Sequence, residues 1–334
     1  MALQFWLYSF AWGAALALMA SGLALYYSVS KVANFAHGEY VSVGVIAYLI
    51  LVALLHGFHN VTGFNIVEPA KFTVDKLALL IPIFFIGGAV SAATFAAVFW
   101  PLMKRGSTPL QLMVVSIGLM FVLRFILYFI ASAFDWLTLP TPESSVIASI
   151  GGVEVTAGIF GSLLLALIAT LFVAWFTRGT MIGVSMRAVA DNPGLAEASG
   201  INVFLVQLVA WFIGGGLAAV GGALMFILTG PPGERPIVEL GWMDLLPIFA
   251  ATVLGGLGSF YGTLVASFIL GLAFNEVSAI LLNYGLDPSL ALAVPFGVTL
   301  AVLLFMPEGL AGLNWGRLYR RLRGVIRGAG GWAS

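Results

Sequence analysis

The chain has 334 residues, of which 61% are hydrophobic and only 8% are charged. A soluble globular domain carries about 25% charged residues, so the composition excludes a soluble protein and indicates a polytopic membrane protein. Cysteine is absent, which excludes a disulfide framework and a thiolate metal site. Net charge is zero, but five of the 14 basic residues lie in the last 18 positions. This tail is typical of a cytoplasmic juxtamembrane anchor, and nothing indicates a nucleic-acid partner.

Apolar runs long enough to cross a bilayer core of about 30 Å recur along the chain. Six of them lie at Phe5–Tyr27, Phe35–Leu55, Leu77–Trp100, Leu110–Ala133, Ile159–Phe176 and Val203–Leu228, and three more lie at Trp242–Leu254, Phe260–Leu282 and Leu290–Met306. The run Trp242–Leu254 is short and is followed by GGLGS, so we interpret it as part of a broken or re-entrant element. The prediction is an all-α polytopic membrane protein with about eight to ten transmembrane helices.

Basic residues in short loops indicate the orientation in the membrane. On this rule Lys104, Arg105, Arg178, Arg187 and the arginine tail share one face, which we expect to be cytoplasmic together with the C-terminus. The loop 134–156 contains acidic residues and no Lys or Arg, so it is expected outside, as is the N-terminus. Lys71 and Lys76 then lie outside against the rule, accompanied by Glu68 and Asp75.

Polar residues interrupt the apolar pattern first at Lys31–Gly44, KVANFAHGEYVSVG. A charged side chain at the bilayer centre costs about 2.5–3.5 kcal/mol, so His37 and Glu39 are expected to face protein or a water-filled cavity. One interpretation is a polar turn at the cytoplasmic interface, with Asn34 as an N-cap. The other, which we favour, is a backbone interruption at Gly38 beside a translocation pathway.

A second interruption is LGGLGSFYG, Leu254–Gly262, with four glycines in nine residues. Glycine costs about 1 kcal/mol in a helix interior. The stretch fits either a tight helix crossing or a second broken element opposite the first. The helices that follow the two stretches are both rich in small residues, which is a weak sign of an internal repeat.

Further polar residues lie inside apolar runs. Arg124 lies within the fourth run, and one hypothesis pairs it with Glu276. Asn275 and Glu276 fit either hydrogen bonding between helices or a role in the pathway. His56 and His59 are expected at an interface rather than at a metal ion.

The stretch 178–202, RGTMIGVSMRAVADNPGLAEASGIN, is predicted to form two short helices. Asn192 suits an N-cap, Pro193 the first helical position and Gly200 the residue after the end. A helix over Pro193–Ser199 has little stability alone, so it is expected to rest on the membrane domain or on another protein.

Several catalytic motifs are missing from the sequence. No lysine follows a glycine, so the chain cannot form the phosphate-binding loop GxxxxGKS/T. HExxH and GxSxG are absent as well, which argues against an enzyme. If ATP drives transport, it must be hydrolysed on another chain.

Four segments resemble the LivH-type permeases, the membrane subunits of branched-chain amino acid ABC importers. VANFAHGEYVSVGVIAYL is similar to the family's INFAHGE segment, GVSMRAVADNPGLAEASGINV to its cytoplasmic loop, TVLGGLGSFYGTLVASFILGLAFNE to its late glycine-rich motif, and PEGLAGL to its C-terminal RPxGLxG motif. Their order spans nearly the whole chain. One departure is Met306, which stands where the family usually has Arg.

The resemblance implies a type II-like ABC importer permease fold, with residues 1–306 as the transmembrane permease domain, 178–202 as its coupling loop and 307–334 as a basic cytoplasmic tail. It implies a multi-pass protein of the bacterial or archaeal plasma membrane. The implied partners are a LivM-like second permease, two LivG/LivF-like ATPase subunits, an external solute-binding protein and the lipid bilayer. No cofactor is expected on this chain, since ATP and Mg²⁺ belong to the ATPases.

Residue roles are also implied by the resemblance. The residues matching the ATPase-coupling loop are Arg187, Ala188, Asp191, Asn192, Pro193, Leu195, Ala196, Gly200 and Ile201. Those matching the pathway or gate are Asn34, Phe35, His37, Gly38, Glu39, Gly255, Gly256, Gly258, Gly262, Asn275 and Glu276.

Branched-chain amino acids are the expected substrates. Urea, short amides or other small polar solutes remain open, because relatives with similar motifs carry them. A stand-alone ion-driven transporter, which would use intramembrane acids such as Glu39 or Glu276, is the alternative from another class.

Overall fold

A computed structural model describes residues 2–56, 71–134, 136–140, 142–228, 234–306 and 308–312. The helices are α1 (Ala2–Ser30), α2 (His37–His56), α3 (Leu80–Thr94), α4 (Trp100–Lys104), α5 (Pro109–Ala133), α6 (Ala157–Gly179), α7 (Met181–Asp191), α8 (Pro193–Ala198), α9 (Val203–Leu228), α10 (Leu240–Gly255), α11 (Phe260–Asn283) and α12 (Ala293–Phe305). A π-helical turn, Phe95–Phe99, joins α3 to α4. Within these described residues, nine segments are long and apolar enough to span a membrane.

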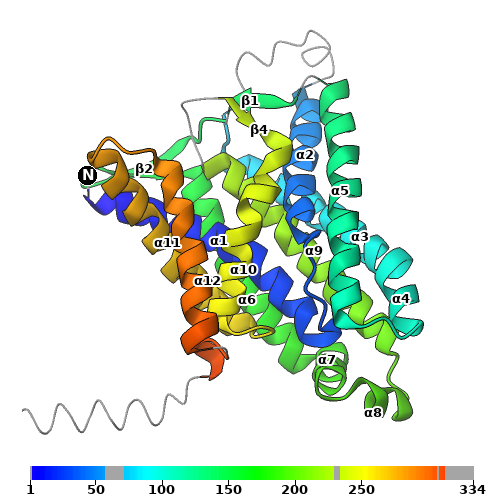
Figure 1. The fold of residues 1–334 in the computed structure, drawn as a ribbon. Coiled ribbons are helices and arrows are strands. Elements are labelled where there is room, and N and C mark those ends of the chain that lie inside the picture. Colours follow the sequence, from blue (N-terminus) through cyan, green and yellow to red (C-terminus); the bar gives the residue numbers. More distant parts are fainter. Residues whose placement is uncertain are drawn as a thin grey trace, which may run out of the picture.

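The four short strands lie together at one end of the helical bundle (Figure 1). Strand β1 (Thr138–Pro140) pairs antiparallel with β4 (Glu234–Pro236), and β2 (Val146–Ile150) pairs antiparallel with β3 (Val153–Thr156). Helices α7 and α8 lie at the opposite end. The prediction of an all-α polytopic protein is confirmed, since both ribbons are small additions to the helical bundle.

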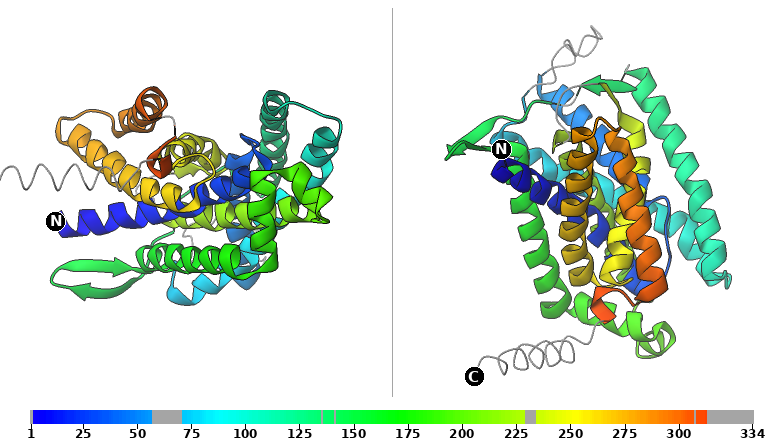
Figure 2. Two further views of the ribbon diagram at one scale, coloured as in Figure 1. Left: turned by 90° about the horizontal axis from the view of Figure 1, so that it is seen from below. Right: turned by 60° about the vertical axis from the view of Figure 1, so that its left-hand side comes forward.

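Helices α1 and α9 form the centre of the bundle, because most of the side chains in their apolar windows are buried. They cross closely at small residues: a Cβ atom on Gly22 of α1 would lie 2.3 Å from the carbonyl oxygen of Gly214 in α9. Small residues allow such close backbone approach in membranes. Helix α5, in contrast, stands at the margin of the bundle with few of its side chains buried (Figures 1 and 2).

The helical segment that contains Trp242–Leu254 begins earlier in the chain than the apolar run predicts. Helix α10 begins at Leu240 and follows a 3-10 turn, Ile237–Glu239, so that a continuous helical stretch of 19 residues reaches Gly255. This differs from the expectation of a re-entrant element at this place. Glu239 interrupts the apolar pattern before Trp242, so hydropathy alone does not reveal that the helical stretch begins earlier.

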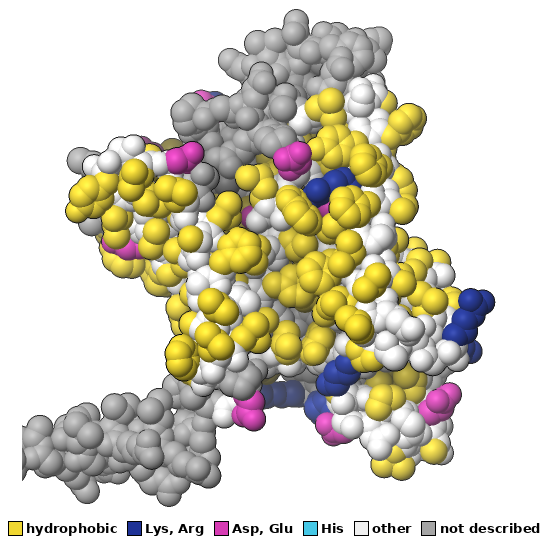
Figure 3. Space-filling view, in the orientation of Figure 1, with side chains coloured by type: hydrophobic (Ala, Val, Ile, Leu, Met, Phe, Trp, Pro, Cys, Tyr) yellow, Lys and Arg dark blue, Asp and Glu magenta, His cyan; other side chains and the backbone are white. Residues whose placement is uncertain are grey.

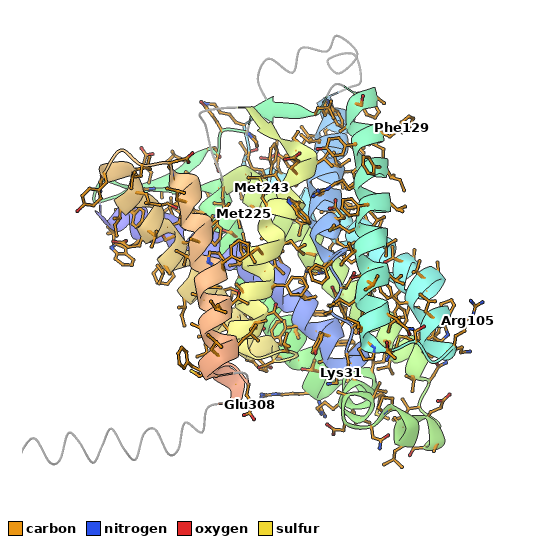
Figure 4. All side chains as sticks on the ribbon, viewed as in Figure 1. Lys31, Arg105, Phe129, Met225, Met243 and Glu308 are labelled. Atoms are coloured by element: carbon orange, nitrogen blue, oxygen red, sulfur yellow. The ribbon has the colours of Figure 1, made fainter. Side chains whose placement is uncertain are left out.

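Charge distinguishes the two ends of the bundle. One end, called the basic end, carries Lys31, Lys104, Arg105, Arg178 and Arg187; Lys31 and Arg105 are labelled there in Figure 4. The other, called the acidic end, carries the four strands, with Glu154 in β3 and Glu143 between β1 and β2. Lys71, the basic residue expected on this side against the rule, forms an ion pair there: its Nζ atom lies 3.2 Å from Oε2 of Glu143.

Candidate functional site

The chain between α1 and α2 leaves the basic end in a non-helical conformation and enters the bundle. Lys31 is exposed, with a positive φ of 57°, whereas Val32, Asn34 and Ala36 are fully buried. The backbone N–H of Phe35 donates to Oγ of Ser116 over 3.0 Å. Ser116 lies seven residues inside α5, or about 10 Å at 1.5 Å per residue. The interruption is therefore inside the bundle, not only at its surface.

Asn34 forms a buried turn that leads into helix α2. Its Oδ1 atom accepts a hydrogen bond from the Ala36 N–H (3.0 Å), and its carbonyl accepts from the His37 N–H (3.3 Å). Its Nδ2 atom donates to the hydroxyl of Tyr40. These bonds form a buried turn just before the first residue of α2, His37, so Asn34 does not occupy the N-cap position considered for it. At this depth an unpaired backbone N–H would be costly.

His37 is held inside the protein by both ring nitrogens. Nε2 lies 2.9 Å from the carbonyl oxygen of Met19, and Nδ1 lies 2.9 Å from the hydroxyl of Tyr26. Because a carbonyl only accepts hydrogen bonds, Nε2 carries a proton. The ring is fully buried and joins α1 to the start of α2.

Glu39 and Arg124 form an ion pair between α2 and α5. Nε of Arg124 lies 3.2 Å from Oε1 of Glu39, and the two side chains are 13% and 0% exposed. The indole of Trp242 on α10 covers the guanidinium, with Cζ 4.9 Å from the ring centre. Three helices therefore surround this pair.

The hypothesis that Arg124 pairs with Glu276 is wrong. Glu276 is exposed on α11, which Figures 1 and 2 show apart from α5. Asn275 donates to the Gly271 carbonyl of its own helix over 2.8 Å. The sequence offered Glu39 and Glu276 as intramembrane acids, and only the arrangement of the helices decides between them.

Gly38 allows α2 to cross α10 closely. A Cβ atom on Gly38 would lie 2.5 Å from the carbonyl oxygen of Gly241. Beside this crossing, Oγ of Ser42 donates to the Val238 carbonyl (3.0 Å) and accepts from the Gly241 N–H (3.1 Å). The start of α2, with Glu39, is thereby fixed against α10.

The late glycine-rich stretch is a tight connection between α10 and α11 at the basic end. Gly256 and Gly258 have positive φ angles of 99° and 85°. A Cβ atom on Gly262 would lie 2.1 Å from the carbonyl oxygen of Gly255. The tight-crossing interpretation therefore describes Gly255 and Gly262, whereas Gly256 and Gly258 form the break between the two helices. The role of these four glycines in a pathway stays a prediction.

The stretch 178–202 forms the two short helices expected, α7 and α8. Asn192 caps α8 through Oδ1, which accepts from the Leu195 N–H (3.0 Å); Pro193 occupies the first turn, and Gly200 has a φ of 86°. In α7 the buried residues Gly183, Met186 and Val189 face the bundle.

Most of the coupling-loop residues are exposed, including Asp191, Asn192, Pro193 and Gly200, while Ala188 and Ile201 are half-buried. Leu195 is 66% exposed and Ala196 only 4%. Arg187 donates to the carbonyl of Thr177 at the end of α6. The arrangement separates residues that face outward from residues that attach the loop to the bundle.

Several residues of these sites were not predicted. Trp242 and the hydrogen bond from Tyr128 to Oε1 of Glu239 (2.9 Å) lie beside the ion pair. Tyr26 stacks on Trp211, with ring centres 4.4 Å apart. Aromatic residues make up 13% of the chain, so the sequence alone does not indicate which of them contact one another.

The expectation that His56 and His59 lie at an interface can be compared with the structure only for His56, because His59 lies outside the described residues. His56 ends α2. Among the residues described, no group of three or more metal-ligating side chains occurs.

A bundle of membrane-length helices with a buried ion pair and an exposed helix pair at one end defines a polytopic membrane protein. Residues 5–303 match the family described as branched-chain amino acid transport system / permease component. The chain therefore belongs to that family.

Individual relatives agree over nearly their full lengths. The chain is 27% identical to the probable branched-chain amino acid transport permease protein LivH of Methanocaldococcus jannaschii, covering 92% of this chain and 91% of the relative. It is 28% identical to the high-affinity permease LivH of Escherichia coli K12, with 90% and 92% covered. For the permease BraD of Pseudomonas aeruginosa the identity is 25%, again with 90% and 92% covered.

Proposed function

We propose that this chain is the membrane-spanning permease subunit of an ABC importer and forms half of the translocation pathway for branched-chain amino acids. The family match over residues 5–303 supports this proposal. In the proposed complex the second half comes from a LivM-like permease, and an external binding protein delivers the solute. Two separate ATPases supply the energy, since this chain has no phosphate-binding loop.

The exposed surface of α7 and α8 is the observation on which the coupling role depends. Met181, Val184 and Leu195 are 84%, 47% and 66% exposed, although all three are apolar. They lie at the basic end, outside the apolar spans. An apolar surface of this kind marks a contact site for another protein, which we propose is the ATPase.

The basic end is proposed to face the cytoplasm of a bacterial or archaeal cell. Lys104, Arg105, Arg178 and Arg187 lie there, and basic residues in short loops favour the cytoplasmic side. The end of α12 then lies on the cytoplasmic side, because this helix runs toward the same end (Figure 1). This orientation puts α7 and α8 where ATPase subunits can reach them.

The coupling role is tested with Leu195→Glu. The substitution puts a charge on the exposed apolar surface, so the ATPase is expected to be lost from the purified complex and ATP-driven uptake abolished. Ile150→Glu is the matched control, because Ile150 is 72% exposed at the acidic end; it should keep the ATPase bound. Retention of the ATPase by the Leu195 variant would contradict the proposed contact.

Arg187 and Ala196 test a different property of the loop. Arg187 is bonded to α6 and Ala196 is packed inward, so Arg187→Glu and Ala196→Trp should displace the loop. Uptake is expected to fall in both variants while membrane insertion stays intact. The loss of ATPase should be accompanied by increased proteolysis within 178–202, which Leu195→Glu should not cause.

The substrate follows from the family description and not from the geometry. Competition of labelled leucine uptake by valine, isoleucine, urea and short amides distinguishes the candidates in cells that carry the whole importer. We expect the branched-chain amino acids to compete and urea not to. The opposite ranking would assign the same architecture to another small polar solute.

An ion-driven transporter that works alone is less consistent with the site. The buried acid Glu39 already has Arg124 as a fixed cation at 3.2 Å, so a coupling ion would have to displace it. Nucleotide-free uptake by the purified single chain would support this alternative. We expect none.

A further inference from the structure

The ion pair lies near the middle of the membrane-spanning region. Arg124 is 15 residues from the start of α5 and nine from its end, or about 22 Å and 14 Å at 1.5 Å per residue. Charged side chains at such depth are rare and usually face a cavity, a partner or a solute pathway. The depth of the Glu39–Arg124 pair therefore points to a functional role.

The two side chains do not satisfy one another completely. Both carboxylate oxygens of Glu39, together with Nε and Nη2 of Arg124, are buried and make no hydrogen bond to any described residue. The 3.2 Å contact between Nε and Oε1 brings the charges close without the geometry of a hydrogen bond. Buried charged groups are normally hydrogen-bonded, so this pair has donors and acceptors left for a further polar molecule.

The pair can be reached from one direction. Helix α5 stands at the margin of the bundle, and Trp242 on α10, which covers the guanidinium, is itself 48% exposed. Arg124 keeps 13% of its side chain exposed, whereas Glu39 behind it has none. On the face between α5 and α10, Arg124 therefore lies closer to the surface than Glu39. Figure 3 shows this face as largely hydrophobic.

An α-amino acid has the charges that this arrangement can accept. Its carboxylate matches the planar donors of a guanidinium, and its ammonium group matches a carboxylate. The Glu39–Arg124 pair is neutral and a zwitterion adds no net charge to it, so binding buries no further uncompensated charge.

We propose that Glu39 and Arg124 form a transient binding site for the zwitterionic head of an amino acid on its way through the membrane. Arg124 binds the carboxylate, Glu39 accepts from the ammonium group, and Trp242 contacts the bound solute. The apolar side chain of the amino acid lies on the hydrophobic face between α5 and α10. This inference rests on the proposed function, since it requires amino acids as substrates.

The test uses the purified importer complex without its binding protein. Binding of labelled leucine is compared with its competition by 3-methylbutylamine, which lacks the carboxylate, and by 4-methylpentanoate, which lacks the ammonium group. Wild-type protein should bind leucine and prefer it over both analogues by about tenfold or more, as expected for the loss of a charged hydrogen bond.

The decisive variant is the double substitution Glu39→Gln/Arg124→Gln. It leaves no unpaired buried charge, so the complex should assemble, but the preference for leucine over the analogues should disappear and uptake should fall. Lys71→Gln/Glu143→Gln removes an exposed ion pair of the same type and is the matched control. Arg124→Lys keeps the charge without the planar donors, and it should weaken leucine binding even if the double variant does not assemble.

Three results would overturn the inference. They are a wild-type complex that does not bind leucine, a wild-type complex that binds all three compounds equally, and a variant complex with unchanged preference and uptake. Failure of the proposed function is a separate result, because the complete wild-type importer would then take up no branched-chain amino acid in proteoliposomes.

Discussion

The two glycine-containing interruptions, Lys31–Gly44 and Leu254–Gly262, look alike in sequence and differ in the structure. The first leaves α1, enters the bundle and brings Glu39 to Arg124. The second turns back at the basic end, with its glycines at positive φ or at close backbone contacts. The first stretch is interrupted at residues 31–36, and its Gly38, where the interruption was expected, lies inside α2 at a close helix crossing. In the second stretch Gly256 and Gly258 form the turn itself.

What separates them is the availability of partners for the freed backbone groups. In the first stretch Ser116 and Asn34 supply hydrogen bonds inside the bundle. Irregular backbone is tolerated at depth only with such partners. The second stretch bonds locally, with the Ser259 N–H donating to the Gly256 carbonyl over 2.8 Å.

The largest effect is expected from Glu39→Leu in the first stretch. Removing one partner leaves Arg124 buried without its counter-charge, which costs about 3–5 kcal/mol. The apparent melting temperature of the detergent-purified protein measures the loss. Glu276→Leu, an exposed acid on the helix after the second stretch, should change stability little; equal effects of both would contradict the comparison.

Gly38→Ala should have the second-largest effect on stability. The added Cβ atom would lie 2.5 Å from the backbone oxygen of Gly241, and overpacking of this kind costs about 1–3 kcal/mol. Gly118→Ala is the control, because its Cβ atom meets nothing within 4 Å in α5; there alanine should stabilise slightly. Thermal unfolding of the two variants should shift in opposite directions.

Gly258→Ala tests the second stretch through its backbone. Its φ of 85° costs a side-chain-bearing residue about 1–2 kcal/mol. Asn tolerates this conformation better, so Gly258→Asn should be milder. If Gly258→Ala and Gly258→Asn have the same melting temperature, backbone strain at this φ angle does not decide the stability of the turn.

The smallest effect is expected from Ser259→Ala. The Ser259 Oγ atom accepts from the Gly262 N–H over 3.1 Å at the start of α11. Because Ser259 is only half-buried, water can replace its hydrogen bond to the Gly262 N–H. The free energy of unfolding should therefore fall by about 1 kcal/mol or less. Asn34→Ala removes the corresponding oxygen at depth and should melt earlier than Ser259→Ala.

Much of the fold could be predicted because each element carries its own signal. The predicted run Val203–Leu228 coincides with α9, and Asn192, Pro193 and Gly200 bound α8 as expected. The start of α10 was missed, since Glu239 breaks the apolar pattern that defines a span. Its side chain accepts from Tyr128, a contact between residues far apart in the sequence.

The class of protein, most of its spans and the two short helices of 178–202 can be predicted from the sequence, because hydrophobic length, caps and breakers act over a few neighbouring residues. Only the tertiary structure decided that Arg124 pairs with Glu39 and not with Glu276, and that Arg187 and Ala196 hold the loop to the bundle while Leu195 faces outward. The physical reason is that ion pairing and burial depend on which helices pack side by side. That packing is set by the whole bundle and not by any one segment.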